Sequence, residues 1–183
     1  MIYFIADHHW GHKAIIWMEN RPFKDVLEMN EFMINSWNSI ITNDDEVYHL
    51  GDISYKMNPN QLKYKILPRL NGKIHLIRGN HDKDKIISKI GDRFESISDY
   101  KYLSYNYENK NYDFALFHYP ITSWANRYRG CIHLHGHDHN FNNDEMEKNY
   151  FGNIMNVSVE HLNYIPISIV DVINNFKNKK LQK

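Results

Sequence analysis

Five short clusters of residue types that commonly bind metal ions follow apolar runs along this chain of 183 residues. The most informative is Gly79-Asn80-His81-Asp82, where the glycine permits a tight turn and places polar side chains beyond the apolar run at 74–77. The other four are Asp7-His8-His9, Gly51-Asp52, His118 and Gly136-His137-Asp138-His139. Any one of them is more often a structural turn than a ligand, but five in equivalent positions predict a shared site that binds cations or moves protons.

The apolar runs before these clusters are typical of β-strands, which we expect at residues 1–6, 46–50, 73–77, 112–117 and 131–135. Helices are predicted near 13–19, 25–40, 61–67 and 83–90, whereas 94–107 favours further strands. A strand near 154–159 follows a polar loop at 140–149, and a capping box from Ser168 to Asp171 begins a last helix that ends near Phe176. This order predicts an α/β fold with α+β character, in which two packed mixed β-sheets are flanked by helices and the five clusters meet at one edge.

Length and composition predict one domain over residues 1–176, followed by a basic tail at 177–183 that is more often solvated than functional. The formal net charge is zero, which argues against a general attraction to nucleic acid or anionic lipid but leaves a local basic groove open. Cys131, the single cysteine, lies in an apolar run and is expected to be buried and inert. Residues 1–6 lack the basic region of a signal peptide and reach Asp7 too soon for one, and no run approaches the roughly 18 apolar residues of a membrane span, so we expect a cytoplasmic protein without membrane contact.

Taken in order, the motifs Asp7-x-His9, Gly51-Asp52, Gly79-Asn80-His81-Asp82, His118 and Gly136-His137-x-His139 resemble the calcineurin-like metallophosphoesterase superfamily. The similarity extends from residue 1 to about residue 139. Gly11-His12-Lys13 and Asn20-Arg21-Pro22-Phe23 also resemble the small bacterial and phage phosphoesterases of that superfamily. The resemblance implies the metallophosphoesterase four-layer sandwich and a metal-dependent hydrolase of phosphate esters.

The resemblance also implies a binuclear metal centre with a defined set of ligands. Asp52 would bridge two divalent cations; Asp7, His9 and His139 would complete one site, and Asn80, His118 and His137 the other. Imidazole and oxygen ligands suit Mn, Fe, Zn, Co or Ni, with Mn expected in vitro. A hydroxide that bridges the cations would attack phosphorus, and His81 would act as general acid toward the leaving group. Asp82 either orients His81 or closes the turn.

Substrate-binding residues are predicted from chemistry and position. Arg127 and Arg129 lie between two ligand motifs, and a guanidinium can bind a phosphate through two hydrogen bonds. Arg21 is the next arginine to consider, and His12 follows the first motif closely enough to contact substrate or a ligand. For each of these residues a structural role is an equal alternative. The remaining histidines are expected to be structural, with His161 reaching the site only if its loop folds back; they are His8, His49, His75, His133 and His135.

These expectations favour a phosphodiesterase that acts on a small phosphate ester or a nucleotide, with nucleic-acid ends as a further possibility and the oligomeric state left open. A phosphomonoesterase, a nuclease and a non-catalytic metal-binding scaffold protein are the alternatives. A scaffold is disfavoured because none of the expected ligand types is missing. A purely structural zinc site is disfavoured because none of the seven candidate ligands is a cysteine.

Overall fold

The first of two β-sheets contains most of the strands that are followed by the candidate functional residues. In the computed structural model, which describes residues 1–139 and 153–181, this sheet has the strand order β4-β3-β2-β1-β9. Its strands are β1 (Ile2–Ile5), β2 (Glu46–His49), β3 (Lys73–Ile77), β4 (Ser96–Ser98) and β9 (Ile167–Ser168). The first four run parallel, so their carboxyl ends share one edge, and β9 pairs antiparallel with β1.

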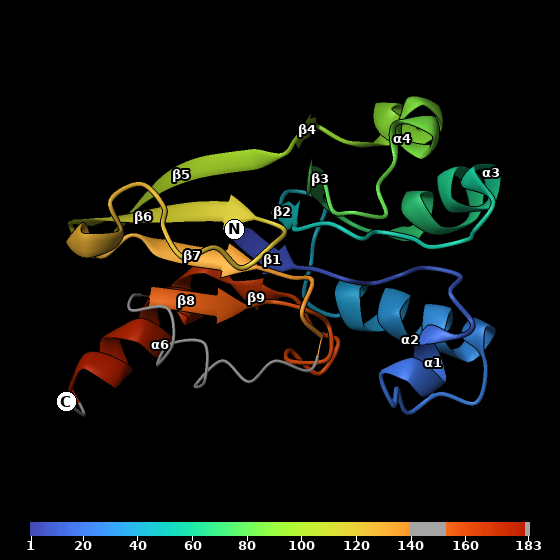
Figure 1. Ribbon diagram of the computed structural model, residues 1–183, viewed down its shortest axis with the longest axis horizontal. Helices are drawn as coiled ribbons and strands as arrows, with labels where there is room; N and C mark the ends of the chain where they lie inside the picture. The colour runs from blue at the N-terminus through green and yellow to red at the C-terminus, as the bar shows by residue number, and fades with distance from the viewer. Residues whose placement is uncertain (140–152, 182–183) are drawn as a thin grey trace.

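The second sheet has the order β5-β6-β7-β8 and packs against the first (Figure 1). It is formed by β5 (Tyr100–Tyr107), β6 (Lys110–Phe117), β7 (Ile132–His135) and β8 (Asn153–Asn156). β5 and β6 form a hairpin whose turn residues, Glu108 and Asn109, both have positive φ angles, of 51° and 60°. β6, β7 and β8 run parallel, so the segments after β6 and β7 also emerge at a common edge.

Helices connect and cover these sheets. They are α1 (Ile15–Met18), α2 (Val26–Asn38), α3 (Pro59–Gln61), the π-helix η1 (Leu62–Ile66), η2 (Leu67–Arg69), α4 (Asp84–Ile90), η3 (Gly91–Arg93), η4 (Arg127–Arg129) and α6 (Ile169–Leu181). The carboxylate of Asp25 caps α2 by accepting hydrogen bonds from the N–H groups of Leu27 and Glu28. Phe32 of α2 is 47% exposed, and its ring contacts that of Phe23.

Two main apolar cores hold the layers together. Between the sheets, Phe4 and Leu50 pack with Phe114 and Leu134 and with the inner face of α6. On the other face of the first sheet, a second core joins β-strand residues to α2, with Met29, Met33 and Trp37 buried. The predicted arrangement of two mixed sheets flanked by helices is therefore confirmed.

The structure differs from the expected elements near the carboxyl terminus. β8 ends at Asn156, and β9 was not predicted because two residues carry no recognisable alternation. α6 continues to Leu181 instead of ending near Phe176, so most of the expected tail is helical, and Lys177 pairs with Glu108 at 2.6 Å. The loop expected at 140–149 lies outside the described residues. Within the part of the chain that the structure describes, none of the helices has the length and apolar composition needed to cross a membrane.

Candidate metal centre

The five motifs meet at the carboxyl edge of the two sheets because each follows the end of a strand. Asp7 follows β1, Asp52 follows β2, Asn80 follows β3, His118 follows β6 and His137 follows β7. Four candidate ligands adopt positive φ angles that residues other than glycine rarely adopt. They are Asp7 (60°), His9 (50°), Asp52 (53°) and His137 (72°). This concentration of strained backbone marks the edge as a functional site.

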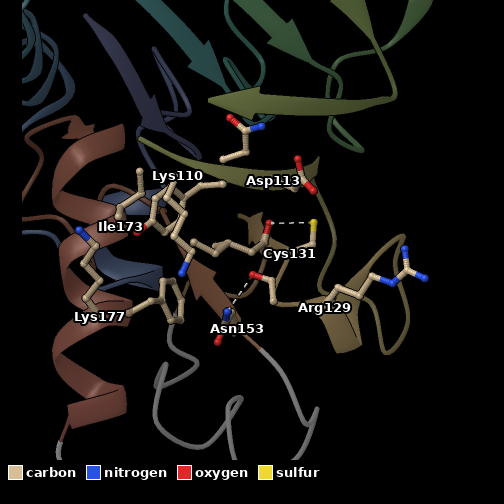
Figure 2. A pocket seen from close by; sticks show the side chains of 12 residues that line it. Lys110, Asp113, Arg129, Cys131, Asn153, Ile173 and Lys177 are labelled. Atoms are coloured by element: carbon tan, nitrogen blue, oxygen red, sulfur yellow. Dashed lines mark hydrogen bonds between the residues drawn. The ribbon is translucent and has the colours of Figure 1, made fainter. Parts of the chain in front are cut away.

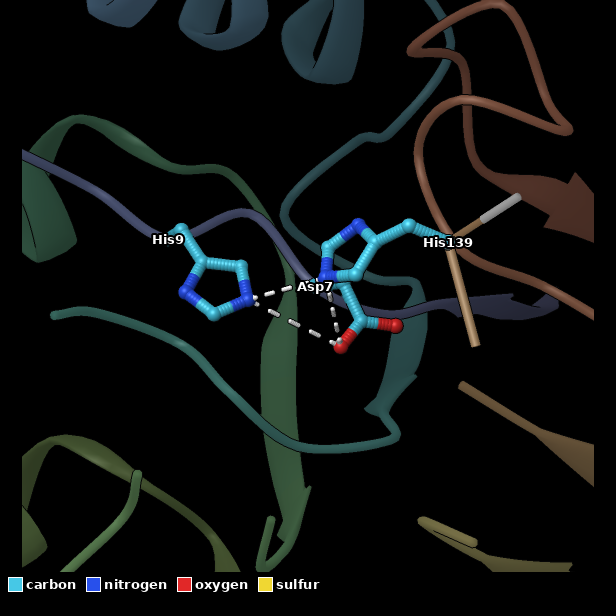
Figure 3. Close-up of side chains that lie close together, drawn as sticks. All are labelled: Asp7, His9 and His139. Carbon is cyan, nitrogen blue, oxygen red and sulfur yellow. Dashed lines mark hydrogen bonds and ion pairs between the residues drawn. The ribbon is translucent and has the colours of Figure 1, made fainter. Parts of the chain in front are cut away.

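The first group of donor atoms comes from Asp7, His9 and His139 (Figure 3). The Nε2 atoms of His9 and His139 lie 3.2 Å apart. Oδ1 of Asp7 is 4.0 Å from Nε2 of His9 and 3.9 Å from Nε2 of His139. Oδ2 of Asp7 accepts hydrogen bonds from the Ser158 hydroxyl at 2.7 Å and from the His137 N–H at 3.0 Å. Oδ1 is buried, faces the two imidazoles and has no hydrogen-bond partner among the described residues. An unpartnered carboxylate oxygen beside two ring nitrogens fits a divalent cation.

The electrostatics of this first group also fit a cation. Burial raises the pKa of Asp7 to about 7, although the charge of His139 acts in the opposite direction. Burial lowers the pKa of His9 far below its usual value, which leaves a neutral imidazole whose lone pair is available. Burial alone would lower the pKa of His139, but its hydrogen bond to Glu160 and the nearby Asp7 raise that pKa to about 8. A bound cation would replace these protons as the partner of the carboxylate.

The second group of donor atoms comes from Asn80, His118 and His137. Oδ1 of Asn80 lies 3.0 Å from Nε2 of His118 and 2.9 Å from Nδ1 of His137. His118 is fully buried, and its Nδ1 donates a hydrogen bond to the Leu50 carbonyl at 2.7 Å. That bond fixes the tautomer and leaves Nε2 free to act as a ligand. The amide oxygen and two ring nitrogens therefore converge on one point.

Asp52 lies between the two groups. Its Oδ2 is 3.6 Å from Nε2 of His9 in the first group and 3.6 Å from Nε2 of His118 in the second. Its Oδ1 accepts a hydrogen bond from the backbone N–H of His81 at 2.8 Å, which fixes the orientation of the carboxylate. The structure thus brings together all seven predicted metal ligands, with the carboxylate predicted as the bridge in the central position.

Close backbone packing holds the central motif against Asp52. A Cβ atom on Gly79 would lie 2.3 Å from Oδ1 of Asp52 and 2.5 Å from its backbone nitrogen, so no larger residue fits. The buried carboxylate of Asp82 accepts hydrogen bonds from the N–H groups of Asp52, Ile53 and Gly79 at 2.8, 3.1 and 2.8 Å. Of the two predicted roles of Asp82, closing the turn is the one that these contacts support.

His81 lies at the edge of the centre, and His12 is buried beside it. Nε2 of His81 lies 3.7 Å from Oδ2 of Asp52, and its side chain is 30% exposed. The ring of Tyr55 contacts both histidines, with centroid distances of 4.4 Å to His81 and 4.5 Å to His12. Burial lowers the pKa of His12 to about 4, so this imidazole is neutral near pH 7. Tyr55 was not singled out from the sequence, where it is one of 13 tyrosines without a distinguishing motif.

Neither Arg127 nor Arg129 lies at this edge, which corrects their predicted assignment to the substrate site. Both belong to η4, immediately before β7, whereas His137 follows the other end of that strand. Arg129 lines a separate pocket with Lys110 and Lys177 (Figure 2). Arg127 and Arg129 lie between two motifs in the sequence, but this does not show which end of β7 their loop occupies.

Arg21 is hydrogen-bonded to the backbone of the first motif and to Glu160. It is buried and donates hydrogen bonds to the backbone carbonyls of Asp7 and His8 at 2.8 and 2.9 Å. It also pairs with Glu160, whose Oε1 accepts a hydrogen bond from Nδ1 of His139 at 3.0 Å. Glu160 thereby orients a candidate ligand, a role that the sequence analysis missed because the residue lies 21 positions beyond His139 in no recognised motif.

Several of the other histidines make contacts within the fold. His8 is buried, stacks on Trp10 and shares a hydrogen bond of 2.9 Å with His49. His133 lies in β7 with its ring nitrogens facing two backbone carbonyls. His161 belongs to the loop after β8, which folds back so that His161 lies near the backbone of His139.

Comparison with known proteins identifies the class to which this fold and centre belong. A family model described as calcineurin-like phosphoesterase matches residues 1–141. The chain therefore belongs to the calcineurin-like phosphoesterase family, which makes it a metal-dependent phosphoesterase.

Relatives from three kinds of source share most of the chain. It is 39% identical over 169 residues to the uncharacterized protein MJ1445 of Methanocaldococcus jannaschii, covering 92% of this chain and 86% of that protein. It is 29% identical over 159 residues to the Gene 66 protein of Mycobacterium phage L5, covering 75% of this chain and 76% of the phage protein. The solved structure of AQ665, a protein of unknown function from Aquifex aeolicus, is similar with a TM-score of 0.70 and 28% identity, covering 95% of this chain and 98% of that one.

Proposed function

We propose that this protein is a phosphodiesterase with a binuclear metal centre. The observation that carries the proposal is the position of Asp52, whose Oδ2 lies 3.6 Å from one nitrogen of each donor group. A carboxylate shared between two sets of ligands is what a pair of cations about 3.5–4 Å apart requires. Asp7, His9 and His139 would complete one cation site, and Asn80, His118 and His137 the other.

The donor set is compatible with several transition metals. All seven ligands offer imidazole nitrogen, carboxylate oxygen or amide oxygen, and none offers a thiolate. This mixture suits Mn, Fe, Zn, Co and Ni, and Mn is the practical choice for reconstitution. When bound, the two cations would lower the pKa of a shared water molecule and neutralise the phosphoryl oxygens.

Protein groups at the rim would complete the reaction. His81 lies beside Asp52 with part of its ring exposed, so its imidazole can donate a proton to the departing alkoxide. His12, held between His9 and Tyr55, lines the same rim and can contact a substrate oxygen. We assign His81 as the general acid and His12 as a substrate-binding residue.

We favour a diester over a monoester because the described residues form no additional domain above the site. From Asp7 to His139 the chain contributes strands, helices and their connections, and none of these described residues forms a separate cap over the centre. A nuclease is less favoured, because Arg127 and Arg129, which could have formed a basic groove at the site, lie at the end of β7 opposite to His137.

The test compares metal-stripped protein with and without added Mn²⁺, using bis(4-nitrophenyl) phosphate and 4-nitrophenyl phosphate as substrates. We expect Mn-dependent hydrolysis that is faster for the diester. Asp52→Asn should reduce both the bound metal and the activity, while Asp44→Asn, a change at an exposed turn residue, should alter neither. Binding of two metal ions without hydrolysis of either ester would contradict the proposal, and faster monoester cleavage would favour a phosphomonoesterase.

A second variant tests the general acid. His81→Ala should retain both metal ions and slow turnover, most strongly for alkyl esters whose leaving groups need a proton. Retention of the full rate on such a substrate would refute the assignment of His81.

A further inference from the structure

A hollow of about 370 Å³ opens directly beside the metal centre. We call it the Tyr119 hollow; its lining includes Asn80, Lys83, Arg78, Phe117 and Tyr119. Its volume lies within the range of roughly 300–1,000 Å³ that is usual for small-molecule sites. Asn80 belongs to both the hollow and the second donor group, so a phosphoryl group held by that group would place one of its ester substituents in the hollow.

One wall of the hollow is aromatic. The rings of Phe117 and Tyr119 have centroids 5.6 Å apart and are inclined by 53°, and Tyr119 is 36% exposed. The Tyr119 ring also packs against His118 and His137, with centroid distances of 5.0 and 4.6 Å. These contacts hold the ring in place, which makes it a preformed surface for stacking.

The rest of the described lining is polar but carries no excess of positive charge. Arg78 donates to both carboxylate oxygens of Asp99 at 2.7 and 2.9 Å and to Asp84 at 2.7 Å. Among the residues that the structure describes, the lining contains the carboxylates of Asp82, Asp84 and Asp99 and two cationic side chains, those of Arg78 and Lys83. A second phosphate would therefore be repelled, whereas a neutral group with polar edges would find hydrogen-bond donors and acceptors.

We propose that the Tyr119 hollow binds the nucleoside portion of a nucleotide diester, with its base stacked on Tyr119 and Phe117. The inference rests on the proposed phosphodiesterase function and specifies its substrate class. A nucleoside combines a planar base, which suits the aromatic wall, with neutral polar edges, which suit the polar part of the lining. Lys83 connects the two regions, since its backbone N–H donates to the His81 carbonyl at 2.9 Å and its side chain lines the hollow.

The kinetic test uses two esters with the same leaving group, thymidine 5′-(4-nitrophenyl) phosphate and methyl 4-nitrophenyl phosphate. For the Mn-loaded protein we expect the KM of the thymidine ester to be lower by about tenfold or more, in line with stacking of a base on an aromatic side chain. Tyr119→Leu should remove most of this difference by raising the KM of the thymidine ester alone. Tyr119→Phe, which keeps the ring, should preserve it.

Matched controls separate stacking from support of the ligands. Phe117→Leu alters the aromatic wall but leaves the Tyr119 ring, which packs against His118 and His137, unchanged, and it should also reduce the preference for thymidine. Tyr64→Leu removes a tyrosine that is 63% exposed in η1 and should change neither KM. Equal KM values for the two esters in the unsubstituted protein, or an equal effect of Tyr119→Leu on both esters, would overturn the inference while leaving a phosphodiesterase in place.

Binding measurements keep the inference testable even if neither ester is hydrolysed. Calorimetry with the Mn-loaded protein should show tighter binding of thymidine 5′-monophosphate than of methyl phosphate, and Tyr119→Leu should abolish that preference. Absence of turnover with this preference intact would contradict the proposed catalytic function alone. Equal binding of the two phosphates would contradict the nucleoside site.

Discussion

Replacing Glu160 with glutamine tests how strongly a buried ion pair supports the metal centre. Oε1 of Glu160 accepts hydrogen bonds from Nε of Arg21 at 2.8 Å and from Nδ1 of His139 at 3.0 Å, and it lies 2.6 Å from the second guanidinium nitrogen. The Arg21 side chain is fully buried and that of Glu160 is 14% exposed. A glutamine carbonyl can occupy the position of Oε1, so the substitution removes the charge while retaining the shape.

The expected cost follows from the burial of the pair. Loss of one partner of a buried ion pair costs about 3–5 kcal/mol, and we expect about 3 kcal/mol because the amide oxygen can still accept hydrogen bonds. Glu31→Gln provides the matched control, since Glu31 forms a comparable pair with Arg69 at 2.6 Å but the two side chains are 56% and 44% exposed. Solvent screening limits that pair to less than about 1 kcal/mol.

Urea unfolding of both metal-stripped variants measures the difference in free energy of unfolding without a contribution from bound ions. Manganese titration then measures the effect on His139, whose ring loses a charged acceptor; we expect affinity to fall by roughly 10- to 100-fold in Glu160→Gln only. If the two variants lose equal stability, the buried pair with Arg21 does not support the fold in the way argued. Unchanged metal affinity in Glu160→Gln would show that the Glu160 contact does not orient a ligand.

Three further predictions concern the core of the site and the regions outside it. Gly79→Ala should lower the free energy of unfolding by about 2 kcal/mol and impair metal binding, because the added methyl group would overlap Asp52. Urea unfolding and metal analysis would check this. Wild-type stability and metal binding would refute the packing argument. Arg127→Ala and Arg129→Ala should leave kcat/KM for a phosphodiester within about twofold of its original value, and a larger loss would return these residues to the substrate site. Burial raises the pKa of Cys131 to about 12, so the protonated thiol should not react with a thiol reagent at pH 8 until the protein is denatured; rapid labelling of folded protein would contradict this.

The positions of the candidate ligands could be predicted from the sequence because strand direction carries them to one edge. An apolar run that forms a parallel strand places the residue after its last position at the carboxyl edge, whatever the details of the turn. Asp7, Asp52 and Asn80 follow three neighbouring parallel strands of one sheet, and His118 and His137 follow two parallel strands of the other. The packing of the two sheets then brings both sets together.

Residues in connecting loops could not be placed by the same reasoning. The loop between His118 and β7 must travel back to the start of that strand, which carries Arg127 and Arg129 away from the ligands. A charge in a connecting segment gives no information about which end of the sheet it occupies. Knowledge that β6 and β7 are parallel would have indicated that the return path ends at the far edge.

The residues that support the ligands were missed for a related physical reason. Arg21 and Glu160 are separated by 139 positions, and their pairing depends on the packing of the loop after β8 against the first motif. Arg21 looks like a phosphate-binding residue in the sequence because its type suits that role; in the structure its donors are used by two backbone carbonyls and by Glu160. A buried guanidinium with its hydrogen bonds directed at ligand-bearing backbone restrains that backbone. It therefore stabilises the strained conformation of Asp7 and His9, where positive φ angles would otherwise favour relaxation of the first donor group.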